Sequence, residues 1–91
     1  MAFYVYIIQS SVDQSYYKGF TENPVLRLQR HNNGETSSTR HLTPWKLVYV
    51  ELQPDKSTAL KRERNLKKAD HSRIEALIIS SKNIVEDFNV G

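Results

Sequence analysis

The chain opens with two aromatic and β-branched runs, YVYII at residues 4–8 and YYKGFT at residues 16–21, separated by a polar segment. Such runs favour β-strands, and the Ser, Asp and Gln residues between them favour a reversal of the chain. The pattern therefore predicts a β-hairpin. Alternation along the strands places Tyr17 and Gly19 on one face of the second strand, where Tyr6 of the first strand can meet them. Two phenols would then lie beside bare backbone.

The remaining elements follow from capping residues and from the spacing of apolar residues. These predict a helix from Pro24 to about Asn32, a strand over 45–52, a helix capped by Asp55 or Ser57 that runs to about Lys68, and a short helix after Asp70. Strict alternation in the third strand puts Leu47, Tyr49 and Glu51 on one side. The order is β-β-α-β-α-α in one domain over residues 1–79. Residues 80–91 are expected to be a frayed or weakly docked tail.

Composition excludes several classes of site. The chain has no cysteine, so disulfides, thiolate zinc sites and cysteine nucleophiles are ruled out, and any metal must bind oxygen or imidazole. Hard cations such as Mg²⁺ would fit best. The first residues lack the order of a signal peptide, and no apolar run approaches the ~18 residues that a membrane span needs. We therefore expect a cytoplasmic protein without membrane contact.

The positive charge is concentrated in one segment. The whole chain carries +3, whereas residues 56–73 hold seven basic and two acidic side chains, a net +5. Such a block can supply phosphate contacts to a nucleic acid, but it is also typical of a solvated helix face. Charge alone does not choose between these interpretations.

Two polar positions on the predicted helices point to chemistry. Arg27 and His31 are four residues apart, so they face the same way on the first helix. Around the second helix, Glu63 lies between Leu66 and Leu60, on the apolar side. A carboxylate there must be paired, protonated or bound to a cation. The alternative is a partly exposed Glu63 that pairs with Lys67.

Taken together, these positions resemble the GIY-YIG nuclease domain, particularly its small stand-alone bacterial members, often catalogued as an uncharacterised protein family. Tyr4-Val5-Tyr6 stands at the first signature and Tyr17-Lys18-Gly19 at the second, followed by Arg27, His31 and the run ALKRE at 59–63. The similarity covers roughly residues 3–78. It implies the GIY-YIG endonuclease fold, in which helices flank a three-stranded antiparallel sheet. This fold belongs to the α+β class, or α/β in the broad sense.

The resemblance also implies hydrolysis of phosphodiester bonds with one divalent ion, Mg²⁺ or Mn²⁺. By position, the catalytic residues would be Tyr6, Tyr17, Arg27, His31 and Glu63, with Glu63 as the metal ligand. Arg27 would bind phosphate, while Tyr6, Tyr17 and His31 all remain candidates for the general base. The expected nucleic-acid contacts are Lys18, Gly19, Arg30, Arg40, Lys61, Arg64, Lys67 and Lys68.

The chain departs from the family pattern in its signatures. Tyr4 replaces the first glycine, and Lys18 stands at the centre of the second signature. No asparagine is clearly equivalent to the late asparagine of several members, for which Asn83 is the candidate. Three functions stay open. The first is a DNA endonuclease of low sequence specificity, with RNA less favoured as substrate. The others are a non-catalytic nucleic-acid-binding module that retained the fold, and a protein-interaction adaptor. We expect a monomer or weak dimer, with a possible protein partner for targeting.

Overall fold

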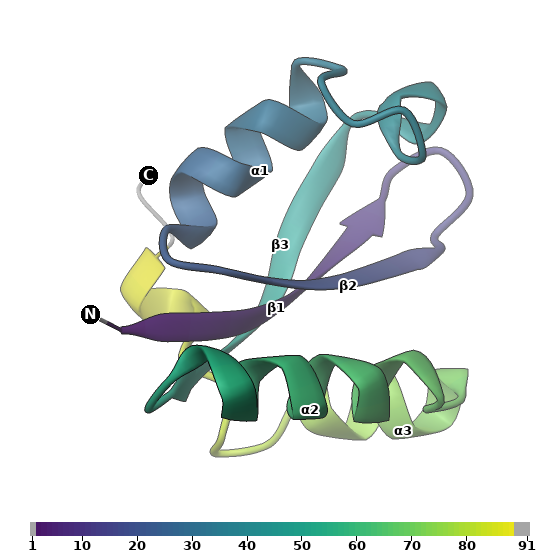
Figure 1. Ribbon diagram of the computed structural model, residues 1–91. Helices are drawn as coiled ribbons and strands as arrows, with labels where there is room; N and C mark the ends of the chain where they lie inside the picture. The colour runs from purple at the N-terminus through teal and green to yellow at the C-terminus, as the bar shows by residue number, and fades with distance from the viewer. Residues whose placement is uncertain (1, 89–91) are drawn as a thin grey trace.

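A three-stranded sheet lies between two helical layers in the computed structural model, which describes residues 2–88 (Figure 1). The strands are β1 (Phe3–Ser10), β2 (Tyr16–Thr21) and β3 (Trp45–Gln53), in the spatial order β2-β1-β3. Both neighbouring pairs are antiparallel. The predicted hairpin, the antiparallel sheet and the α+β class are therefore confirmed.

Three α-helices begin at the residues that the sequence predicts. They are α1 (Pro24–Asn32), α2 (Lys56–Lys67) and α3 (His71–Ile78). The side chains of Asn23, Asp55 and Asp70 each accept a hydrogen bond from a backbone N–H of the first turn. Two short 3-10 helices, η1 (Arg40–Leu42) and η2 (Val85–Phe88), were not predicted. In the described part of the chain, no helix combines the length and hydropathy that crossing a membrane requires.

The central strand β1 contributes to two cores, one on each face of the sheet. On one face, Val5 and Ile7 pack with Tyr49 of β3 and with apolar residues of α2 and α3. On the other face, Tyr6 and Ile8 form a cluster with residues of β3, against which α1 and the segment after α3 pack. Tyr6 and the second core therefore lie on the α1 side of the sheet.

The alternation predicted for β3 is wrong at Leu47. The register between β1 and β3 shifts between Ile7 and Ile8, so that Ile7 faces Tyr49 and Ile8 faces Leu47. This irregularity turns Leu47 into the core on the α1 side, while Tyr49 stays in the core beneath α2 and α3. A bulge inserts an extra residue and reverses the faces of the side chains that follow it.

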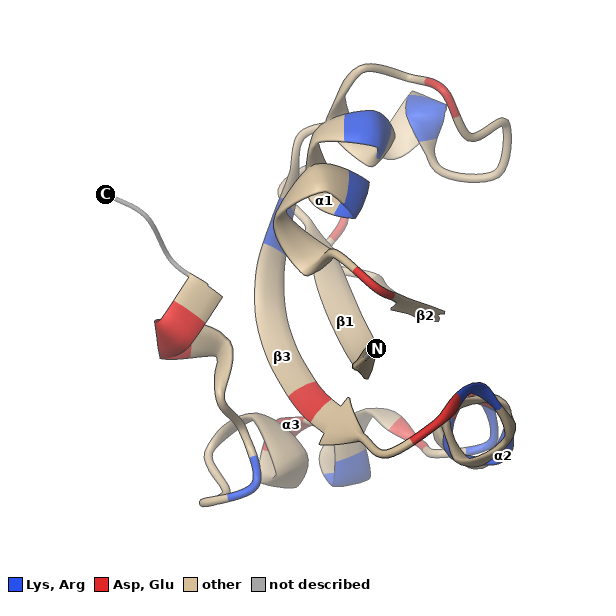
Figure 2. Cartoon of the chain, turned by 60° about the vertical axis from the view of Figure 1, so that its left-hand side comes forward, with Lys and Arg blue, Asp and Glu red and all other residues tan. Residues whose placement is uncertain are grey.

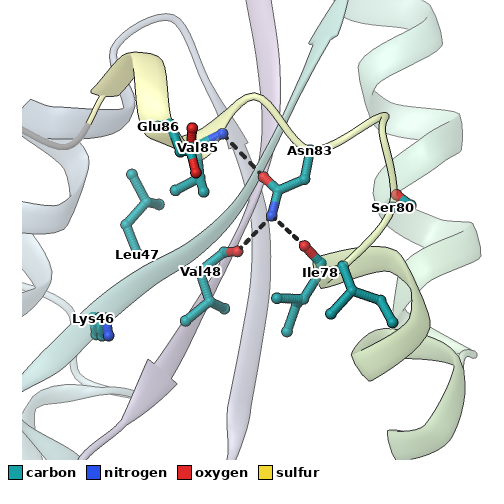
Figure 3. Close-up of a pocket in the computed structure, with 9 residues that line it drawn as sticks. Lys46, Leu47, Val48, Ile78, Ser80, Asn83, Val85 and Glu86 are labelled. Atoms are coloured by element: carbon teal, nitrogen blue, oxygen red, sulfur yellow. Dashed lines mark hydrogen bonds between the residues drawn. The ribbon is translucent and has the colours of Figure 1, made fainter.

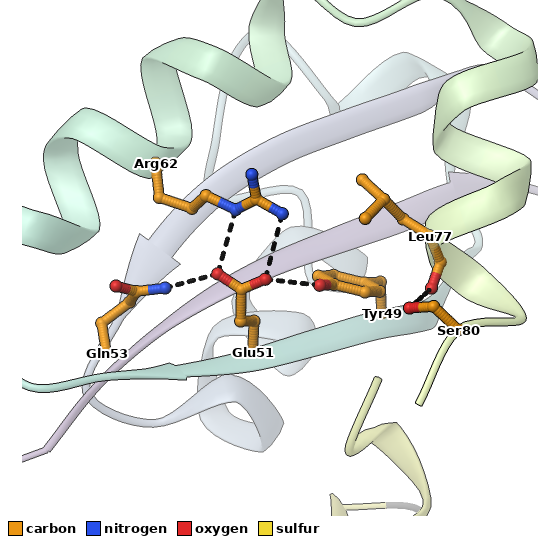
Figure 4. A network of polar contacts seen from close by, with 6 residues as sticks. All are labelled: Tyr49, Glu51, Gln53, Arg62, Leu77 and Ser80. Carbon is orange, nitrogen blue, oxygen red and sulfur yellow. Dashed lines mark hydrogen bonds and ion pairs between the residues drawn. The ribbon is translucent and has the colours of Figure 1, made fainter. Parts of the chain in front are cut away.

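A carboxylate network fixes α2 on the sheet (Figure 4). Arg62 of α2 donates two hydrogen bonds to Glu51 of β3, at 3.0 and 3.1 Å, and the Tyr49 hydroxyl donates a third at 2.6 Å. Gln53 donates a fourth from its side-chain amide. The bonds from Tyr49 and Gln53 hold the mostly buried carboxylate in place on β3, and the two bonds from Arg62 fix how α2 is rotated about its axis.

The segment after α3 lies along the outer edge of β3 (Figure 3). The side-chain amide of Asn83 donates to the carbonyls of Val48 and Ile78, and its oxygen accepts from the N–H groups of Val50 and Val85. Residues 80–88 of the expected tail are thus tied to the sheet, and residues 89–91 lie outside the described residues. A pocket of about 530 Å³ opens beside Asn83, and none of the residues expected to be catalytic lines it.

Gly19 is buried beneath the Tyr6 ring. The two residues face each other across β1 and β2, and a Cβ at position 19 would lie 2.7 Å from the Tyr6 hydroxyl oxygen and 2.8 Å from its ring carbon Cζ. The space that bare backbone leaves is therefore filled by a phenol. A methyl group here would overlap a ring that the surrounding core holds in place.

We predict that Gly19→Ala lowers the free energy of unfolding by about 1–3 kcal/mol, because it overpacks the site beneath Tyr6. In a Tyr6→Leu background the same change should cost at least about 1 kcal/mol less, since the clashing ring is absent. Urea denaturation of the two single variants and the double variant measures this coupling. Equal costs in both backgrounds would contradict the contact.

Candidate active site

The hairpin and α1 bring four of the five residues expected to be catalytic onto one face of the sheet. Tyr6 and Tyr17 come from β1 and β2, and Arg27 and His31 come from successive turns of α1. The His31 ring lies 5.9 Å from the Tyr6 ring and 5.0 Å from the Tyr17 ring, measured between centroids. Ile8 lies opposite Tyr17 on the neighbouring strand, which places both phenols on the α1 side.

A buried hydrogen-bond chain runs through His31. Its Nε2 lies 2.9 Å from the Tyr6 hydroxyl, and its Nδ1 lies 2.9 Å from Oγ1 of Thr39. The side chain of His31 is 0% exposed, and the exposed fractions of Tyr6 and Thr39 are both 1%. Because His31 has no access to solvent, it cannot act on a water molecule directly.

Burial favours the neutral forms of Tyr6 and His31. Burial raises the pKa of Tyr6 to about 12; the Arg27 guanidinium acts in the opposite direction, and the neighbouring Tyr17 hydroxyl and Glu63 carboxylate act with burial. Burial lowers the pKa of His31 to about 4, with Arg27 acting in the same direction. At pH 7 the pair is therefore a neutral phenol beside a neutral imidazole.

Glu63 lies on α2, in the other helical layer. Its negative charge contributes to the raised pKa of the Tyr6 hydroxyl, whereas Arg27 lowers that pKa. The Glu63 side chain is 15% exposed, and its Oε1 lies 3.5 Å from Nζ of Lys67, which is 56% exposed. The predicted pairing of Glu63 with Lys67 is therefore present in the structure. An exposed ammonium is a weakly held counterion, which a bound cation can replace.

The basic residues fall into separate groups. Lys61, Arg64 and Lys68 are exposed and, at 100° per residue, lie within about 60° of one another around α2. Figure 2 shows α1 and α2 on either side of the edge strand β2, each carrying Lys or Arg. Lys18 points to the opposite face of the sheet from Tyr6, since its partner Ile7 packs beneath α2 and α3. Arg30 and Arg40 are exposed on α1 and η1.

Glu63 is the residue that would hold a metal ion at this site. No group of three or more His, Asp or Glu side chains able to hold a metal occurs within residues 2–88. Mg²⁺ is usually bound by one or two carboxylates together with water and substrate phosphates, rather than by an all-protein cage. Glu63, with a single exposed lysine as counterion, is compatible with a site of that kind.

Comparison with known proteins identifies the family of this chain. A family model described as the GIY-YIG catalytic domain matches residues 2–75. The chain belongs to the GIY-YIG family. A UPF0213 protein of Syntrophus aciditrophicus is 42% identical over 82 residues, which cover 88% of this chain and 91% of that protein. A UPF0213 protein of Clostridium perfringens is 41% identical over 85 residues, covering 92% of this chain and 89% of that protein.

A solved structure shares the architecture of this GIY-YIG domain. The solution NMR structure of a UPF0213 protein from Bacillus halodurans matches with a TM-score of 0.58 and 29% identity, over 98% of this chain and 95% of that one. The resemblance to the small UPF0213-type members is therefore confirmed. Family membership indicates a nuclease-type domain that generally uses a divalent metal and a nucleic-acid substrate. The names of these relatives state no activity, so membership does not specify the reaction.

Sequence reasoning missed Thr39. It lies in the polar segment 33–44, where neither periodicity nor a motif distinguishes it from the neighbouring Ser and Thr residues. Its position depends on contacts with residues distant in the chain, namely His31 and the indole N–H of Trp45, which donates to the Thr39 carbonyl at 2.9 Å. No local signal could have identified it.

We predict that the buried His31 makes the protein less stable in mild acid. Its pKa is lowered from 6.5 to about 4 in the folded chain, so between these values the unfolded chain binds the additional proton. The free energy of unfolding should fall as the pH drops from 6.5 to about 4, with His31 contributing at most ~1.4 kcal/mol per pH unit. Denaturation curves across this range, compared with those of His31→Gln, measure the contribution.

The carboxylates also titrate in this range, but they do so in both proteins, so the difference in slope belongs to His31. The His31→Gln variant should lose less stability per pH unit than the parent. Identical slopes would mean that His31 takes up a proton in the folded state as readily as in the unfolded state.

Proposed function

We propose that this chain is a divalent-metal-dependent endonuclease that hydrolyses phosphodiester bonds of DNA with low sequence specificity. One observation supports this more than any other. The Tyr6 hydroxyl lies 2.9 Å from a buried, neutral imidazole, and the charges of Arg27 and Glu63 both act on it. A proton acceptor, a phosphate-binding cation and a metal-binding acid are the groups that in-line attack on a phosphodiester requires.

Arg27 and Glu63 would handle the charge of the phosphate. The planar guanidinium of Arg27 can donate to a non-bridging oxygen and compensate the charge that grows there during attack. Glu63 would hold the metal ion, which when bound supplies Lewis-acid polarisation of the phosphate. Lys67 would then leave the Glu63 carboxylate, and its exposed position allows this without disturbing the core.

The proton of the attacking water would pass through Tyr6. His31 is fully buried, so the proton that its Nε2 can accept is that of the Tyr6 hydroxyl, at 2.9 Å. Among residues 2–88, no hydrogen bond joins the Tyr17 hydroxyl to a comparable base. Tyr6 would take a proton from water as its own proton moves to His31. Movement of Arg27 onto the phosphate would uncover the hydroxyl, which the resting site shields.

Three exposed basic residues on or next to α2 would position the substrate without recognising its sequence. Lys61, Arg64 and Lys68 are exposed on the helix that carries Glu63. Contacts to phosphates fix the position of a nucleic acid but carry no sequence information. Cleavage of many different sequences, with binding that weakens as salt increases, is therefore expected.

We predict that purified protein nicks supercoiled DNA in the presence of Mg²⁺ or Mn²⁺, and that Glu63→Gln and Arg27→Ala reduce the rate by about 100-fold or more. Glu75→Gln and Arg73→Ala are matched controls, because these residues are exposed on α3, outside the site. The controls should cleave at the parental rate. Circular dichroism checks that every variant is folded.

Other outcomes distinguish the alternatives. Nicking by the parent that survives in both Glu63→Gln and Arg27→Ala would overturn the assignment of these residues. Salt-sensitive DNA binding without cleavage in the parent would instead indicate a non-catalytic nucleic-acid-binding module. Repeating the assay with single-stranded DNA, branched DNA and RNA determines the preferred substrate.

A further inference from the structure

The buried imidazole of His31 has one hydroxyl partner on each nitrogen. Tyr6 lies against Nε2 and Thr39 against Nδ1, both at 2.9 Å. A neutral imidazole carries a proton on only one nitrogen, and the hydrogen bonds of its surroundings decide which one. The partners of the two hydroxyls therefore define the tautomer.

On the Thr39 side, the hydroxyl proton is directed elsewhere. Oγ1 of Thr39 lies 3.4 Å from the backbone carbonyl oxygen of Thr36, to which it donates. A hydroxyl has a single proton, so when that proton is donated to the Thr36 carbonyl, the oxygen of Thr39 is left to accept a hydrogen bond from His31. That arrangement requires the ring proton on Nδ1.

On the Tyr6 side, the same tautomer gives the phenol proton an acceptor. Nε2 of His31 lies 2.9 Å from the Tyr6 hydroxyl oxygen, and an unprotonated Nε2 can accept its proton. The Arg27 charge lowers the pKa of this hydroxyl, which favours donation of the proton. A proton at Nδ1 and a lone pair at Nε2 therefore satisfy both contacts of the ring.

We propose that Thr39 is a positioning residue that holds His31 in the Nδ1–H tautomer, so that the Nε2 lone pair accepts the hydroxyl proton of Tyr6. The catalytic part of this inference rests on the proposed nuclease function, whereas the tautomer is a property of the folded protein. If the proton lay on Nε2, the ring would donate to the Tyr6 oxygen, and the phenol proton would have no acceptor there. Thr39 thus acts on the reaction through His31 and Tyr6, without touching substrate.

The backbone of Thr39 is held independently of its hydroxyl. The Trp45 indole N–H donates to the Thr39 carbonyl at 2.9 Å, and the Thr39 N–H donates to the Thr36 carbonyl at 3.1 Å. Thr39→Val keeps the shape of the side chain and removes only the hydroxyl, while Thr39→Ser keeps the hydroxyl and removes a methyl group. The two variants therefore separate hydrogen bonding from packing.

The direct test is long-range ¹H–¹⁵N NMR of the His31 ring at pH 7, in protein with ¹⁵N-labelled histidine. We expect a protonated Nδ1 and an unprotonated Nε2 in the parent and in Thr39→Ser, and loss of this single tautomer in Thr39→Val. His31→Gln assigns the signals. A parent protein with the proton on Nε2 would overturn the proposal, and this result does not depend on how any variant folds.

Nicking assays test the consequence for the reaction. Thr39→Val should lower the nicking rate by about 10- to 100-fold and change its pH profile, at unchanged affinity for DNA, while Thr39→Ser stays close to the parent. Parental nicking by Thr39→Val would overturn the positioning role. A parent that never nicks DNA contradicts the proposed function instead, and the NMR result then still decides the tautomer.

Discussion

The packing of the Tyr6 phenol over Gly19 is the constraint on which the other features depend. The ring fills the space above bare backbone, and its hydroxyl reaches Nε2 of His31 at 2.9 Å. For this contact to form, β1 must lie at the centre of the sheet, β2 must present Gly19 opposite Tyr6, and α1 must cover the same face. The aromatic signatures therefore specify the local fold and the candidate active site together.

The direction in which Glu63 points depends on the rotation of α2, which is fixed on the sheet. Arg62 donates two hydrogen bonds to Glu51 on the face of the sheet beneath α2. The next residue, Glu63, is turned by about 100° around the helix axis, and its charge acts on Tyr6. A structural ion pair and a candidate metal ligand are thus neighbours in sequence, and the first orients the second.

Local signals predicted much of this structure, and long-range contacts explain what they missed. Helix starts were predictable because a cap such as Asn23 lies within three residues of the N–H that it binds. The face of Leu47 was mispredicted because a bulge depends on how two strands pair. Thr39 and the contact between Tyr6 and Gly19 depend on residues brought together only by folding. The resemblance predicted the candidate site as a set, but not the hydrogen bonds that orient it.

The central claim is that the Tyr6 hydroxyl, and not merely its ring, carries the proton transfer. The most direct measurement is the rate of DNA nicking by Tyr6→Phe, which keeps the ring above Gly19 and removes one oxygen atom. The account predicts a folded protein with parental affinity for DNA and a rate at least about 100-fold lower. Nicking at the parental rate by Tyr6→Phe would contradict it and would assign the proton transfer to another group.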